Sequence, residues 1–448
     1  MSFFQKLKNL QPYTLKLYNL KKQELNLIHN KISELKLSPD FLAELNKPRT
    51  GVIYKNDFLF LNNLSNDFMN NQKIKENFHN IKSLGRGLKL IDANFLEFVK
   101  SLEKENFSKI DLIILYKVLM ISCINILNPK ISHDTLNKIY SNMKDYSQYD
   151  PLYISTKIDE ALIFFRTTNN FKEIRNQLIE QIAKAKITDQ PYLEIKGWLI
   201  LAQLYMSTNQ NIFSNVYCSF GEKLYNKQKY NDENLLKKIL LLKINNMKES
   251  KFKKITKNLD PEIREVVLAD YYTSCAKNIN INNPKSIYKS WKVIHDLLES
   301  VNTKQDPHHP ALVVLLSYYW ILSYKLGRES IANFYLEKAK NLLASNSLLE
   351  ENFYFRFYVL LISEASNFEL PQDIVFSNYK NLNTPNKLCF DMLLFRSFSL
   401  YYSVLKGDEK ETVLSKYNEL NKLYEIYFGG KNESILPLER KLQEVGYL

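Results

Sequence analysis

The pattern of apolar and polar positions predicts a helical chain from residue 151 onward. Apolar residues recur there at the spacing of one helix face, in segments separated by Pro, Gly, Asn and Asp. The segments fall into pairs that begin about every 40 residues, and an interval of this size indicates an α-solenoid. We place the starts of the pairs at Pro151, Pro191, Asp232, Pro261, His308, Ser347 and Pro385.

Proline and glycine positions support this division. Pro151, Pro191, Pro261 and Pro284 stand where a helix would begin, and proline is tolerated at the first helical position because the amide hydrogen it lacks would be unpaired there anyway. Polar breaks within the pairs, such as residues 168–170, Gly327-Arg328 and Gly407-Asp408, allow a tight turn between two helices.

The first 150 residues have a different pattern. Helices are predicted over residues 15–37 and 64–82, with a short helix over residues 38–45. The segment GVIYKNDFLFL, Gly51 to Leu61, predicts one β-hairpin. Two alternatives stay open: residues 15–62 are a winged-helix-like DNA-binding segment, or the hairpin caps the end of the repeat array. We therefore expect an N-terminal region over residues 1–150 and a helical-repeat domain over residues 151–448.

Composition favours an all-α fold. The 448 residues include only 10 glycines but 29 tyrosines and 26 phenylalanines. All-β folds and nucleotide-binding α/β folds need glycines at turns and phosphate loops, whereas the aromatic rings suit the core between packed helices.

One apolar run, Ile110 to Leu127, is long enough to require a test against membrane insertion. It contains Asp111 and Lys117 and barely reaches the length of a span, so we expect a buried central helix and no membrane span. The four cysteines are far apart and are expected to be buried thiols in a reducing, intracellular compartment, the cytoplasm or the nucleus.

Two stretches resemble the tetratricopeptide repeat. In the first, Trp198, Leu201, Ala202 and Tyr205 match the first helix of that motif, and small residues match the second helix. In this stretch the small residues are Ser214, Cys218 and Gly221. In the second stretch, after Gly327, the small residues Ala332 and Ala339 and the large residue Leu336 match the second helix of the motif.

The stretch that begins at His308 also resembles the longer repeats of kinesin light chains, in which a His-Pro step precedes the first helix. Leu316, Tyr319 and Trp320 depart from the motif, and the other pairs match in spacing alone. The resemblance implies a right-handed α-α superhelix of about seven helical hairpins, with a groove that binds peptides or partner proteins. By the same resemblance, the groove would be lined by Lys196, Gln203, Ser317, Tyr324 and Lys325.

The net charge of +13 is compatible with nucleic acid, an anionic membrane or acidic proteins, and equally with a lysine-rich composition that has no function. The most basic segment runs from residue 236 to 257. Its lysines are expected to face water and form either a solvated surface or an anion-binding patch. They are Lys237, Lys238, Lys248, Lys251, Lys253 and Lys254.

No motif for catalysis, metal or cofactor binding emerges. His308 and His309 point about 100° apart on a helix, so they cannot share a metal ion as residues four apart do. Gly85-Arg86-Gly87 lacks the pattern of a phosphate loop, and Asp159-Glu160 is expected to be exposed.

The sequence thus predicts a non-enzymatic helical-repeat protein without cofactor, which binds a protein or peptide as an adaptor or as a subunit of an assembly. The alternative is a transcriptional regulator whose residues 15–62 bind DNA and whose repeats sense a partner. General RNA binding through basic faces is a third possibility.

Overall fold

A computed structural model describes most of the chain. It covers residues 3–302 except for 40, 48, 53, 55–60, 86–90, 127–128, 168–170, 208–209, 231, 244–248 and 278–283, together with nine residues between 319 and 334 and residues 400–448 except for 401–402, 405–406 and 429–435. The described residues are helical and include no strand. The expected all-α class is confirmed at this level.

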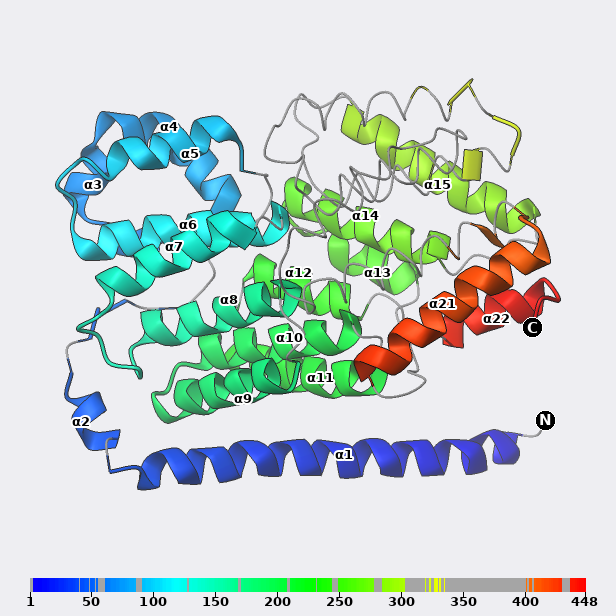
Figure 1. The fold of residues 1–448 in the computed structure, drawn as a ribbon, viewed down its shortest axis with the longest axis horizontal. Coiled ribbons are helices and arrows are strands. Elements are labelled where there is room, and N and C mark those ends of the chain that lie inside the picture. Colours follow the sequence, from blue (N-terminus) through cyan, green and yellow to red (C-terminus); the bar gives the residue numbers. More distant parts are fainter. Residues whose placement is uncertain are drawn as a thin grey trace.

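The N-terminal third begins with one long helix and continues with shorter ones. Helix α1 lies along one side of the molecule, beside α9 and α11 (Figure 1). The elements are α1 (Phe3–Leu37), α2 (Phe41–Leu45), the 3₁₀ turn η1 (Leu61–Asn63), α3 (Asn66–Asn70), α4 (Gln72–Gly85), α5 (Ala93–Leu102), α6 (Lys109–Ile126) and α7 (Pro129–Asn142).

Helical pairs follow in the middle of the chain, and two further helices are described near the C-terminus. The pairs are α8 (Pro151–Thr167) with α9 (Phe171–Ile187), α10 (Pro191–Ser207) with α11 (Asn211–Gln228), α12 (Glu233–Leu242) with α13 (Glu249–Thr256), and α14 (Pro261–Lys277) with α15 (Pro284–Asn302). The last two helices are α21 (Lys410–Phe428) and α22 (Leu436–Glu444).

The predicted helix boundaries agree well with the structure where local chemistry sets them. Each of the four prolines named above is the first residue of a helix. Asp232 caps α12, because its side chain accepts a hydrogen bond from the amide of Leu235. Gly327 and Gly407 have positive φ angles of 68° and 80°, which a residue without Cβ adopts at low cost.

The helices pack as a ladder. The first helix of each pair contacts the first helix of the next, so that α4 touches α6, α6 touches α8, α8 touches α10, α10 touches α12, and α12 touches α14. Within the pairs, α6 packs on α7, α8 on α9, α10 on α11 and α14 on α15. The ladder includes α4, α6 and α7 from before residue 151, where the apolar pattern predicts no repeat, and the proposed domain boundary at that residue stays a prediction.

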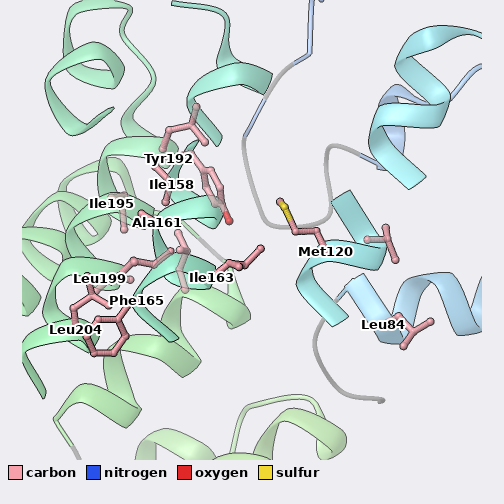
Figure 2. Close-up of a cluster of buried hydrophobic side chains, with 14 of the residues drawn as sticks. Leu84, Met120, Ile158, Ala161, Ile163, Phe165, Tyr192, Ile195, Leu199 and Leu204 are labelled. Atoms are coloured by element: carbon pink, nitrogen blue, oxygen red, sulfur yellow. The ribbon is translucent and has the colours of Figure 1, made fainter. Parts of the chain in front are cut away.

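A continuous hydrophobic cluster fills the space between these first helices. Figure 2 shows part of it, with Leu84 of α4, Met120 of α6, Ile163 of α8 and Leu199 of α10. Because α6 lies inside this core, its segment from residue 113 to 120 is buried throughout. No helix among the described residues is both long and apolar enough to cross a membrane.

The predicted hairpin at Gly51 to Leu61 is not seen. Among its described residues, Gly51, Val52 and Tyr54 lie in no strand, and Leu61 begins the 3₁₀ turn; the remainder lies outside the described residues. Val52 and Tyr54 are buried, and the ring of Tyr54 stacks on Tyr192 of α10 at 6.1 Å between centroids. Among the described residues, the apolar side chains of Val52 and Tyr54 are therefore buried in the protein core without forming a strand.

Close packing between α10 and α11 depends on a small residue at position 221. A Cβ added to Gly221 would lie 2.9 Å from Cδ2 of Leu199, closer than carbon atoms normally approach. Trp198, Leu201, Ala202 and Tyr205 are buried at this crossing, as are Ser214 and Cys218 of α11. In this pair, burial of the residues that carry the repeat resemblance agrees with the role expected for them. Ala332, Leu336 and Ala339 lie outside the described residues.

We predict that Gly221→Val destabilises the protein by about 1–3 kcal/mol, because the added isopropyl group must displace Leu199 in a filled core. Urea denaturation followed by circular dichroism measures the change. Asn226→Val, at an exposed position of the same helix, is the control and should cost less than about 1 kcal/mol through helix propensity alone. Equal losses for both variants would contradict the close crossing.

Candidate functional site

The most distinctive group in the ladder is a carboxylate between two ammonium groups. Asp159 lies in the middle of α8. Its Oδ2 accepts a hydrogen bond from Nζ of Lys117 on α6 at 3.0 Å, and its Oδ1 accepts one from Nζ of Lys196 on α10 at 2.7 Å. One side chain therefore joins three successive first helices.

Burial makes this ion triad strongly coupled. Asp159, Lys117 and Lys196 have relative exposures of 3%, 1% and 5%. Burial by itself would raise the pKa of the Asp159 carboxyl, but the attraction of Lys196 and Lys117 outweighs burial and lowers this pKa to about 2. Lys117 also donates to Oγ1 of Thr156, one turn earlier on α8, at 3.4 Å. The charges hold one another in place inside the stack.

The neighbouring carboxylate, Glu160, is buried as well, with an exposure of 6%. It accepts hydrogen bonds from Nζ of Lys157 at 2.8 Å and from Nε2 of Gln177 on α9 at 3.0 Å. The prediction that Asp159 and Glu160 are exposed is wrong, because α8 is packed against α6, α7, α9 and α10 and has little free surface. Asp159 is paired with two lysines and Glu160 with one, an arrangement typical of structural ion pairs.

A second buried polar group attaches α1 to the stack. Glu24 of α1, only 6% exposed, accepts a hydrogen bond from Nη2 of Arg175 on α9 at 2.8 Å and another from Oη of Tyr217 on α11. Ile28, one turn further along α1, is 1% exposed and belongs to the main core. Glu24 and Ile28 are the buried members of α1 among its described side chains.

Aromatic side chains connect this contact with α10. The ring of Tyr217 stacks on Trp198 at 5.7 Å and lies 5.3 Å from Tyr205, both on α10. Burial raises the pKa of Tyr217 well above its usual value, so the phenol stays protonated and donates to Glu24. The position of α1 is thus coupled to the packing between α10 and α11.

The predicted groove residues are only partly described. Lys196 does not line an open groove: it is buried and paired with Asp159, which corrects its expected exposure. Gln203, two turns further on the same face of α10, is half-buried. Ser317, Tyr324 and Lys325 lie outside the described residues, and peptide binding by any of these five residues stays a prediction.

The predicted basic patch is divided between two helices, α12 and α13. Lys237 is buried and does not face water, which corrects the expectation, because α12 packs against α10, α11 and α14. Lys238 is half-buried and Lys254 is exposed. Lys251 and Lys253 belong to α13 but their side chains are not described, and Lys248 lies outside the described residues. Anion binding by this segment stays a prediction.

No metal centre is assembled in the part of the chain that the structure describes. Among the described residues, no group of three or more His, Cys, Asp or Glu side chains could hold a metal ion. His308 and His309 lie outside the described part of the chain. Cys218 is buried, and burial raises the pKa of its thiol to about 12, which makes the thiolate unfavourable.

The sequence contained a signal for the ion triad that the helix pattern alone did not resolve. Lys117 interrupts an apolar run, and a cation on a helix buried all round needs an anionic partner. Its partner, Asp159, is 42 residues away, and Glu24 and Arg175 are 151 residues apart. Nothing in a single sequence pairs residues at such separations.

We predict that Asp159→Asn lowers the free energy of unfolding by about 3–5 kcal/mol at pH 7, because it leaves two buried ammonium groups without their anion. Urea denaturation measures the loss. The control is Asp145→Asn: Asp145 has a 77% exposed side chain at 3.4 Å from Lys109, so we expect a change within about 0.5 kcal/mol.

The dependence on pH gives a second check of the same prediction. The folded-state pKa of Asp159 lies below its ordinary value of 3.8, so its stabilisation is present above about pH 4 and is lost as the pH falls towards 2. The difference between wild type and Asp159→Asn should shrink over that interval. A difference that is unchanged down to pH 2 would contradict the ion triad.

We predict that Glu24→Gln loosens α1 without unfolding the stack, because Arg175 loses its anionic partner while α8 to α11 keep their own contacts. Hydrogen exchange followed by mass spectrometry should show about tenfold faster exchange in α1, with α10 unchanged. Glu34→Gln, whose carboxylate is exposed and paired with Lys31 on the same helix, is the control and should leave α1 protected. Equal exchange of α1 in both variants would refute the anchoring role of Glu24.

Comparison with known proteins supplies no relative from which a function could be inferred. No family model, no curated protein and no solved structure matches this chain.

Proposed function

We propose that this protein is a non-enzymatic helical-repeat protein that binds another protein, as an adaptor or as a subunit of a larger assembly. Its architecture in this proposal is a right-handed tetratricopeptide-like superhelix. The ladder of contacts between successive first helices supports the repeat architecture, since each pair in a solenoid buries its faces against its neighbours. The close crossing at Gly221 supports the resemblance in the pair α10–α11.

The observation that carries the binding function is where large apolar side chains are exposed. Of nine such side chains among the described residues, six lie on α1 and α2, and the concentration is more informative than scattered exposed residues would be. The six are Leu15, Tyr18, Leu25, Leu27, Leu37 and Leu42. Exposed apolar side chains concentrated on two helices of a charged surface suit a site that a protein partner covers.

The contacts of Thr50, Val52 and Tyr54 weigh against the regulator alternative. Val52 and Tyr54 face the core, and Thr50 donates from its backbone amide to Oδ2 of Asp150 at 2.7 Å. A wing that contacts DNA has to project from the protein, whereas the described residues Thr50 and Tyr54 are held against the start of α8 and against α10. The scaffold interpretation is therefore favoured.

The test is capture of partners by the full chain from a lysate of its own cells, with mass spectrometry and a DNA-retention assay at two salt concentrations. We expect a protein in stoichiometric amount. Its capture should be lost when the six side chains on α1 and α2 are changed to Ser. The control bait changes Tyr288, Phe334 and Leu448 to Ser, the other three exposed apolar side chains, and should keep the partner. Recovery of nucleic acid alone, or equal capture by both variants, would refute the proposal.

A further inference from the structure

Exposed side chains on α1 form a stripe that repeats like the contact face of a coiled coil. Leu15, Tyr18 and Leu25 are 61%, 65% and 36% exposed, and Lys22 and His29 are exposed at the intervening positions. Steps of three and four residues alternate along this series, which keeps the side chains on one face of a helix with 3.6 residues per turn. We call these five residues the outer stripe. It lies away from the face that carries Glu24 and Ile28.

Positive charges far outnumber negative charges along α1. The helix contains seven lysines and two glutamates, and one of the two, Glu24, is buried against Arg175. The other, Glu34, is paired with Lys31 on the same helix and lies off the outer stripe. Lys22 therefore lies between Tyr18 and Leu25 with no acidic residue in the outer stripe, and Lys36 continues the same series one heptad beyond His29.

We propose that the outer stripe of α1 binds an acidic amphipathic helix of a partner protein, a proposal that rests on the protein-binding function proposed above. Apolar side chains of the partner helix pack between Leu15, Tyr18 and Leu25, and carboxylates beside them pair with Lys22 and Lys36. The two requirements arise from separate observations: the spacing selects a helix, and the missing negative charge selects an acidic one.

Two other occupants fit the outer stripe less well. A second copy of α1 would place its own lysines against Lys22 and Lys36, and like charges in such a contact oppose association. An anionic membrane favours a helix with a broad apolar face, but the outer stripe has three apolar side chains, Lys22 interrupts them, and the opposite side of α1 is docked on α9 and α11.

The experiment measures binding of a fluorescent synthetic peptide of about four heptads, with Leu at the core positions and Glu beside them, to the full-length protein by anisotropy. We expect saturable binding that weakens with salt. Lys22→Glu should reduce the affinity about tenfold, whereas Lys16→Glu, an equally large charge change at an exposed position off the stripe, should reduce it less than about threefold. Leu25→Ser and Leu27→Ser form the matched apolar pair, with Leu25→Ser the weaker binder. Circular dichroism checks that each variant is folded.

A charge-reversed peptide, with Lys in place of Glu, supplies the complementary test. It should bind the double variant Lys22→Glu/Lys36→Glu more tightly than it binds wild type. The proposal is overturned if wild type does not bind the acidic peptide, or if the Lys16 and Lys22 variants bind it equally. It is also overturned if Lys22→Glu weakens binding to phosphatidylserine vesicles, or self-association measured by sedimentation, and leaves peptide binding unchanged. After any of these results the proposed protein-binding function still holds if changing the six exposed apolar side chains of α1 and α2 to Ser abolishes capture of the partner protein. Absence of any captured protein, in contrast, refutes the proposed function itself.

Discussion

The stack of first helices depends on one carboxylate, that of Asp159, held between Lys117 and Lys196. Apolar contacts between α6, α8 and α10 are non-directional and would tolerate a shift of one helix along another. A buried ion triad would not, because any shift that separates Lys117 or Lys196 from Asp159 leaves a charge unpaired in the core. We infer that the apolar cluster supplies the stability of this region and that the triad selects the relative positions of its helices.

The same alignment determines how α1 docks. Lys196 and Trp198 are two residues apart on α10, so the ion pair of Lys196 also fixes the position of Trp198 along the stack. Tyr217 of α11 stacks on Trp198. Tyr217 and Arg175 then present their donors to Glu24 of α1. A carboxylate on α1 can be buried at this point because two donors from different helices already meet there.

Local signals predicted the helices well, whereas the polar contacts escaped sequence analysis. Prolines mark helix starts and Gly221 marks a close crossing, because backbone geometry acts within a few residues. Asp159 was misplaced on the surface because an isolated helix pattern does not show that α8 is covered on several sides. The alternating pattern from Gly51 to Leu61 predicts a hairpin, although burial of Val52 and Tyr54 against the protein core accounts for the apolar positions that the structure describes. Contacts between distant residues decide both cases.

The surface proposed for partner binding is itself a consequence of this packing. As an isolated helix α1 would display both of its glutamates beside its seven lysines. Docking removes Glu24 from the surface and turns the side of Ile28 inward, so that the remaining exposed face is more basic than the composition of the helix suggests. The interaction that attaches α1 thereby also determines the chemistry of the face that it presents, and a partner that recognises that face recognises the folded stack as well.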